Sequence, residues 1–84
     1  MPRRTDYPLQ VTCTRHGLPV KLTWPTKRRS EKIAEILDQW REVGAWWDAE
    51  PERQVYLVVT TTQKSYEVYQ VLQTGSWYLT RVFD

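Results

Sequence analysis

The chain has 84 residues, of which 40% are hydrophobic, and its mean hydropathy is −0.65. A chain of this size and composition predicts one domain with one modest core, and no apolar run approaches the roughly 20 residues that a membrane-spanning helix needs. The single cysteine excludes an internal disulfide framework, so we expect a cytoplasmic protein.

The net charge of +2 is unevenly distributed along the chain. Residues 1–30 carry seven basic residues and one acidic residue, whereas residues 31–84 carry five basic and nine acidic residues. The basic third could bind an acidic partner or a nucleic-acid backbone, or it could be a solubilising loop and tail. No apolar stretch follows the first arginines, so we expect no signal peptide.

The first folded element is predicted to be a β-hairpin. We interpret residues 1–8 as a disordered lead and residues 9–84 as a single globular domain. Residues 9–14 and 20–24 alternate apolar and polar side chains, which is typical of half-buried strands. The glycine between them supplies a turn, so the two strands are expected to pair antiparallel.

Residues 31–42 are predicted to form a helix. Their apolar side chains are spaced i, i+3, i+4 and i+7, as on one face of a helix: Ile33, Ile36, Leu37 and Trp40. Ser30 is a suitable N-cap and Gly44 a suitable stop. The acidic side chains of the segment are expected in solvent: Glu31, Glu35, Asp38 and Glu42. A bulged strand is the alternative, because Ile and Trp also favour sheets.

The rest of the chain is predicted to form a three-stranded meander. Residues 55–61, 65–72 and 77–83 are rich in β-branched and aromatic side chains, and short polar turns separate them. The expected fold is therefore α+β and β-rich. It has about five antiparallel strands, an N-terminal hairpin plus the C-terminal meander, in a twisted sheet or half-open SH3-like barrel with one helix at about 31–42.

The sequence offers little for catalysis or metal binding. Cys13 and His16 provide two ligands, whereas a zinc site needs at least three protein ligands, and we interpret them as a buried thiol and a solvated turn histidine. No glycine-rich phosphate loop is present. We therefore expect no enzyme activity, no catalytic residues, no cofactor and no metal.

The aromatic content is the strongest functional signal. Five tryptophans and five tyrosines exceed what so small a domain usually buries. We interpret Trp24, Trp40 and Trp77 as structural. The predicted partner-binding residues, some on an exposed aromatic platform, are Trp46, Trp47, Tyr56, Tyr69 and Tyr78. Such residues are typical of protein-binding hot spots, of base-stacking surfaces or of cross-strand pairing alone.

Basic side chains lie close to these aromatic residues in the predicted architecture. The candidates for binding nucleic acid or an acidic partner are Lys27, Arg28, Arg29, Arg53 and Arg81. In this hypothesis the first three track phosphates while tyrosine and tryptophan rings stack on bases.

The spacing of the aromatic residues resembles a known family. The matching strings are Ile36-Leu37-Asp38-Gln39-Trp40-Arg41, Gly44-x-Trp46-Trp47, Arg53-x-x-Tyr56 and Gly75-x-Trp77-Tyr78-Leu79-x-Arg81-Val82-Phe83-Asp84. Over roughly residues 18–84, the chain is similar to a small bacterial domain of unknown function. That domain also resembles the C-terminal module of ImuB-type proteins, the catalytically inactive Y-family polymerase relatives of the bacterial mutasome.

The resemblance implies a role but supplies no catalytic residues. It implies an accessory function in translesion DNA synthesis through contacts with a RecA-like partner and an error-prone C-family polymerase. The leading hypothesis is thus a non-enzymatic interaction module in DNA repair that acts through protein contacts. The alternatives are a single-stranded nucleic-acid-binding domain and a homodimeric structural protein; the chain itself is expected to be a monomer or a weak homodimer.

Overall fold

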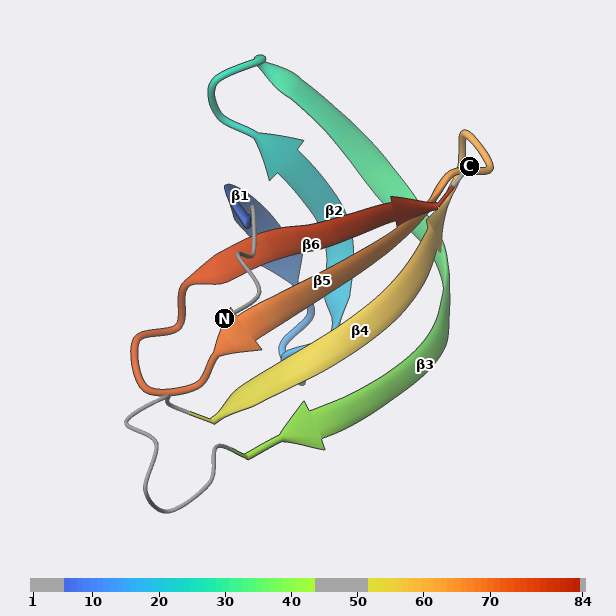
Figure 1. Cartoon of the computed structure of the whole chain (residues 1–84). Helices are drawn as coiled ribbons and strands as arrows, with labels where there is room; N and C mark the ends of the chain where they lie inside the picture. The colour runs from blue at the N-terminus through green and yellow to red at the C-terminus, as the bar shows by residue number, and fades with distance from the viewer. Residues whose placement is uncertain (1–5, 44–51, 84) are drawn as a thin grey trace.

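The computed structural model describes residues 6–43 and 52–83 and shows a closed antiparallel β-barrel (Figure 1). Each strand pairs with the next in sequence, and the last pairs with the first. The strands are β1 (Tyr7–Cys13), β2 (Pro19–Trp24), β3 (Arg29–Glu42), β4 (Arg53–Thr60), β5 (Ser65–Val71) and β6 (Trp77–Phe83). The described residues contain no helix, and therefore none that could cross a membrane.

The predicted hairpin and meander are confirmed, but the predicted helix is wrong. The hairpin is β1 and β2, the meander is β4 to β6, and residues 31–42 belong to strand β3. The fold therefore has six strands and no described helix, in place of five strands and one helix. The barrel is closed, whereas the sequence predicted a twisted sheet or a half-open SH3-like barrel.

Bulges in β3 explain why its sequence resembles a helix. The register with β4 slips between Ile33 and Glu35 and again between Ile36 and Asp38, so that one extra residue is inserted at each place. On a regular strand every second side chain points into the barrel. After a bulge, the next side chain that points inwards is three residues further along and not two. Ile33 and Ile36 consequently both pack against the core, three residues apart, on an extended strand. The bulged strand, the alternative open in the sequence, is the correct structure.

The core fills the inside of the barrel. Its buried members come from every strand except β3 and include Trp24 and Trp77, as predicted: Leu9, Leu22, Trp24, Tyr56, Val58, Tyr66, Val68, Trp77 and Leu79. Trp40 is only half-buried and is not part of this cluster, because its cross-strand partner is Val55 on the outer side of β4. The third tryptophan interpreted as structural therefore lies outside the core.

The barrel is closed by a short seam between β1 and β6. Among residues 6–43 and 52–83, three residue pairs form it: Tyr7 with Leu79, Pro8 with Tyr78, and Leu9 with Trp77. β1 therefore begins two residues before the predicted strand, and the expected disordered lead does not include Tyr7 and Pro8. Residues 1–5, the rest of that lead, lie outside the described residues.

A pair of leucine variants tests the revised account of β3. Leu22 is 0% exposed in the core, so Leu22→Ala is expected to lower the free energy of unfolding by about 2–4 kcal/mol. Leu37, which a helix would place on its apolar stripe, is 50% exposed at a bulge. Leu37→Ala is therefore expected to cost less than about 0.5 kcal/mol in a urea titration. Equal losses of unfolding free energy in the two variants would contradict the assignment of residues 31–42 to a strand.

Candidate functional site

A buried carboxylate joins three strands at one end of the barrel. Glu31 of β3 is 6% exposed and lies opposite Leu22 of β2. Its side chain is hydrogen-bonded to residues of β4 and β5. Its Oε1 accepts hydrogen bonds from the hydroxyls of Thr60, at 3.0 Å, and Thr62. Its Oε2 accepts from the Tyr66 hydroxyl at 2.7 Å and from Arg29 Nη2 at 2.7 Å. Both oxygens are thus fully used by donors of the protein.

These donors keep Glu31 ionised. Burial by itself raises the pKa of the carboxyl, because the charged form loses its hydration. The hydrogen bonds from Thr62, Tyr66 and Thr60, together with the Arg29 charge, outweigh burial and lower the pKa to about 2. A charge that would be costly in an apolar interior is therefore stabilised by four groups that converge on it.

The Glu31 carboxylate also fixes the turn between β4 and β5. Thr60 and Thr62 both belong to this turn, which is closed by the Thr60 amide donating to the Lys64 carbonyl at 2.8 Å. Gln63 completes it with a positive φ of 65°. Because Glu31 holds two of the turn's hydroxyls, the position of Lys64 at its end is determined by a residue on β3.

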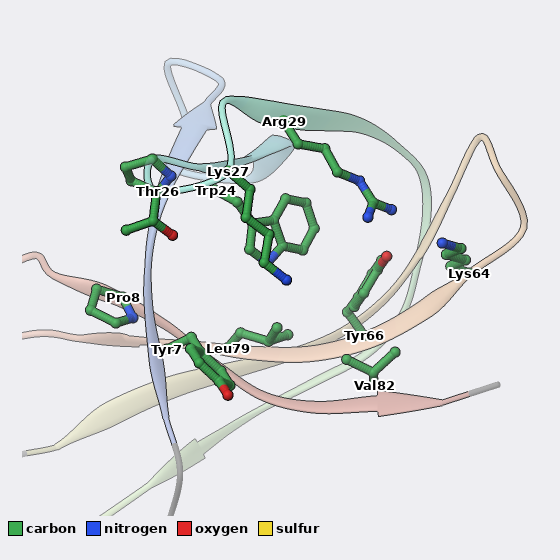
Figure 2. A pocket seen from close by; sticks show the side chains of 11 residues that line it. Tyr7, Pro8, Trp24, Thr26, Lys27, Arg29, Lys64, Tyr66, Leu79 and Val82 are labelled. Atoms are coloured by element: carbon green, nitrogen blue, oxygen red, sulfur yellow. The ribbon is translucent and has the colours of Figure 1, made fainter.

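A cavity of about 470 Å³ opens beside this carboxylate. Figure 2 shows Trp24, Lys27 and Arg29 on one side of it, facing Tyr66, Leu79 and Val82 across the opening, with Tyr7 and Pro8 beside them and Lys64 near Tyr66. The Trp24 and Tyr66 rings come from these two facing sides and contact each other, with their centroids 5.4 Å apart, so that together they form an aromatic wall. The Arg29 guanidinium is 5.4 Å from the Trp24 ring centroid, within the range of a cation–π contact.

The rim of the cavity is cationic. Arg29 is paired with Glu31 at 2.7 Å, so the two charges largely cancel. Lys27 and Lys64 also line the cavity, and within residues 6–43 and 52–83 neither forms an ion pair. The site therefore combines aromatic and aliphatic walls with two lysines whose charge is available to an anionic ligand.

The predicted basic residues divide between this site and other places. Lys27 and Arg29 line the cavity, as part of or next to the β2–β3 turn. Arg28 lies in the same turn with a positive φ of 49° but does not line the cavity. Arg53 and Arg81 lie elsewhere, at the start of β4 and opposite Glu67 of β5. The five cations are therefore not one binding surface.

The predicted aromatic platform is wrong for two of its residues. Tyr56 is 6% exposed and belongs to the core, and Tyr69 is 8% exposed. Tyr69 is covered on the outer side of the barrel by Arg53, 4.8 Å from its ring centroid, and stacks on Tyr78 at 5.3 Å. Its hydroxyl donates to Asp6 at 2.6 Å.

Three predicted site residues, Arg53, Tyr69 and Tyr78, are thus brought together by packing on the outer side, away from the cavity. Tyr78 remains half-buried. Trp46 and Trp47, the other predicted partner-binding residues, lie outside the described residues.

The two candidate metal or nucleophilic residues do not form a site. Burial raises the pKa of the Cys13 thiol, which keeps it protonated and weakly nucleophilic. His16 is exposed in the turn that follows β1. In the described part of the chain, no three His, Cys, Asp or Glu residues are grouped closely enough to hold a metal ion.

Several site residues were missed by the sequence reasoning. Glu31 was expected in solvent, and Tyr66 and the threonines of the β4–β5 turn were not singled out. The residues that bind Glu31 from β4 and β5 are 29 to 35 positions away from it in the sequence, so no local pattern reveals these contacts. The available signal lies in β3 itself: on a strand, Arg29, Glu31 and Ile33 alternate onto one face, which places Glu31 next to an apolar residue.

Comparison with known proteins identifies the family. A family model described as a domain of unknown function, DUF6504, matches residues 1–84. The chain belongs to this family. No curated protein and no solved structure matches it. The family therefore supports the expectation of a domain of unknown function and leaves its activity to be argued from the site.

Replacing the buried carboxylate tests its role in stability. Because the pKa of Glu31 falls from 4.5 to about 2 on folding, its contribution is complete above pH 4.5 and is lost as the pH falls towards 2. Glu31→Gln is expected to lower the free energy of unfolding at pH 7 by about 2 kcal/mol, since hydrogen bonds to the charged group are weakened. It should also flatten the pH dependence of stability in that acid range, as measured by urea titrations at several pH values.

The matched control is Glu35→Gln, an exposed carboxyl on the same strand. It is expected to leave the stability at pH 7 within about 0.5 kcal/mol of the wild type. An unchanged acid dependence in the Glu31 variant would refute the assignment.

Proposed function

We propose that this protein is a non-enzymatic interaction module that binds an acidic segment of a partner protein at the barrel-end cavity. The observation that carries the proposal is the convergence, on one opening, of an aromatic wall and two lysines that form no ion pair with the residues that the structure describes. Neither feature alone indicates a ligand, but together they match a segment with both apolar and acidic side chains.

The walls suit an apolar side chain. Trp24, Tyr66 and Leu79 are buried members of the core whose surfaces also line the cavity. An apolar group that enters this space exchanges water for aromatic and aliphatic surface, and each buried CH₂ group contributes about 0.8 kcal/mol. The walls of the cavity thus supply affinity through the hydrophobic effect.

The rim suits acidic side chains. Lys27 comes from the β2–β3 turn and Lys64 from the β4–β5 turn, so that cations flank the opening from two elements. Glu31 does not repel an acidic ligand strongly, because Arg29 and three hydroxyl donors already neutralise and screen its charge. The same saturation makes Glu31 an unsuitable general base, which supports binding in preference to catalysis.

The proposed cellular context is bacterial translesion DNA synthesis. It rests on the aromatic spacing shared with the C-terminal module of ImuB-type proteins, which implies a RecA-like protein or an error-prone polymerase as the partner. Trp46 and Trp47, which carry part of that spacing, stay candidates for the same interface. The cavity adds a chemical requirement, since the partner must offer acidic and apolar side chains together.

Single-stranded nucleic acid is the second candidate ligand. The observation that favours it is Trp24 beside Lys27 and Arg29, since a base can stack on the ring while a phosphate meets the cations. The burial of Tyr56 and Tyr69 counts against it, because it removes the exposed platform on which successive bases would stack. The protein ligand is therefore the better supported of the two.

Charge-reversal variants test the proposed function. We expect a short fluorescein-labelled peptide of alternating glutamate and leucine to bind the wild type, as measured by fluorescence anisotropy. Lys27→Glu and Lys64→Glu are each expected to weaken binding by about threefold to tenfold, because each turns a rim attraction into a repulsion. Both side chains are exposed, so the fold is expected to persist.

The control is Lys32→Glu, an exposed lysine of β3 outside the cavity, which should change the affinity by less than about twofold. Equal weakening by all three variants, or no binding to the wild type, would count against the site. An oligothymidylate of about eight nucleotides is tested alongside the peptide. Tighter, salt-sensitive binding of the oligonucleotide would favour the second candidate.

A further inference from the structure

We infer that the acidic partner segment binds as an added β-strand along the free edge of β6, next to the cavity. This inference rests on the proposed function and specifies how the partner is held: main-chain hydrogen bonds to residues 80–83 provide register, while alternate side chains enter the cavity. Strand addition of this kind uses an exposed sheet edge for affinity and adjacent pockets for specificity.

The edge arises because β6 is longer than its seam with β1. On one side β5 pairs with β6 from Trp77 to Phe83, with a register slip at Thr80. On the other side β1 pairs only with residues 77–79. Within residues 6–43 and 52–83, no strand pairs with the second side of Thr80 to Phe83. The outward N–H and C=O groups of this stretch form a template for another strand.

A contact on the outer side of the barrel shows why β1 stops there. Asp6, the residue before β1, accepts a hydrogen bond from the Tyr69 hydroxyl at 2.6 Å. Tyr69 lies on β5 and stacks on Tyr78 of β6, outside the core cluster. Asp6 is therefore held by Tyr69 on the outer side of the barrel, and it is not part of the pairing between β1 and β6.

The cavity lies directly beside this edge. Leu79 and Val82 of β6 line it, and Trp24 of β2 and Lys27 of the β2–β3 turn face them across the opening (Figure 2). Side chains of an added strand would alternate, with every second one turned into the cavity and the others turned outwards. Val82, which is 52% exposed, would be covered by the added strand. The geometry therefore fits a segment in which apolar residues alternate with polar ones.

The charge around the edge selects acidic residues as the polar ones. Lys27 and Lys64 flank the opening, whereas the local carboxylate, Glu31, is saturated by its donors. Charge complementarity thus identifies the occupant as an extended peptide of a partner protein in which Asp or Glu alternates with apolar side chains.

A second free edge in the barrel is built differently. Residues 33–42 of β3 pair only with β4 in the described part of the chain. Two bulges interrupt this edge, and Glu35 and Asp38 are exposed along it. Bulges and charges of this kind are how proteins prevent unwanted strand pairing. The stretch after Thr80 has neither further slips nor carboxylates among residues 81–83, so the acidic segment is expected at β6 alone.

Backbone methylation of the ligand tests strand addition. The alternating glutamate–leucine peptide is prepared in two N-methylated forms, one methylated at the glutamates and one at the leucines. In an added strand only every second amide donates to β6, so one form should lose at least about tenfold in affinity while the other keeps most of it. The side chains are the same in both forms, so a ligand held by the cavity alone would show no such difference.

Amide exchange and two proline variants locate the peptide. Peptide binding is expected to slow the hydrogen exchange of amides within residues 80–83, measured by NMR on the full chain. Successive N–H groups of a strand point to opposite edges, so Arg81→Pro and Val82→Pro remove one donor towards β5 and one towards the free edge. We expect one variant to be destabilised and the other to remain folded but to bind the peptide at least about tenfold more weakly.

The outcomes separate this inference from the proposed function. If the lysine reversals weaken peptide binding but methylation at either position has the same effect, strand addition is overturned and the proposed function stands. If the amides of residues 80–83 that point away from β5 are already protected in the free protein, the edge is occupied by the chain or by a second copy, and the inference fails. If only the oligonucleotide shifts these amides, both proposals are overturned.

Discussion

The Glu31 carboxylate is the interaction on which the end of the barrel depends. A charge inside a small apolar barrel is unfavourable unless donors replace its hydration, and here Thr60, Thr62, Tyr66 and Arg29 do so. These donors come from the starts or ends of three strands and from the β4–β5 turn. Satisfying one carboxylate therefore fixes the β4–β5 turn and the Tyr66 ring, and places Arg29 over the aromatic wall. Two of the groups that neutralise this charge, Arg29 and Tyr66, also line the cavity.

Much of the fold could be predicted because period-two alternation is local information. Both predicted strands of the hairpin and all three of the meander are present. The helix was wrong because two bulges in β3 give Ile33 and Ile36 a spacing of three, which periodicity assigns to a helix. Bulges depend on how a strand fits its neighbours, so the sequence of one segment does not reveal them. Barrel closure depends likewise on pairing between distant strands.

The site was predictable only where its residues are close in sequence. Trp24, Lys27 and Arg29 surround one turn and were recognised as inward-facing or basic. Glu31 and Lys64 are brought to the same end of the barrel only by folding, and composition treats both as ordinary surface charges. Tyr69 was wrongly expected to be exposed because β5 has an inner and an outer side. Its outer side is covered by Arg53 and Tyr78, which the pattern of one strand does not show.

The three-pair seam between β1 and β6 has a consequence for how the molecule folds. It joins the first and last strands in sequence, so closing it restricts more of the chain than any hairpin does. The hairpins between neighbouring strands close much shorter loops. We expect the seam to form late in folding and to open first. Local opening at the seam would leave the six strands as a curled sheet that is no longer closed. The edge of β6 that we propose as the binding edge thus lies next to the shortest strand pairing among the described residues.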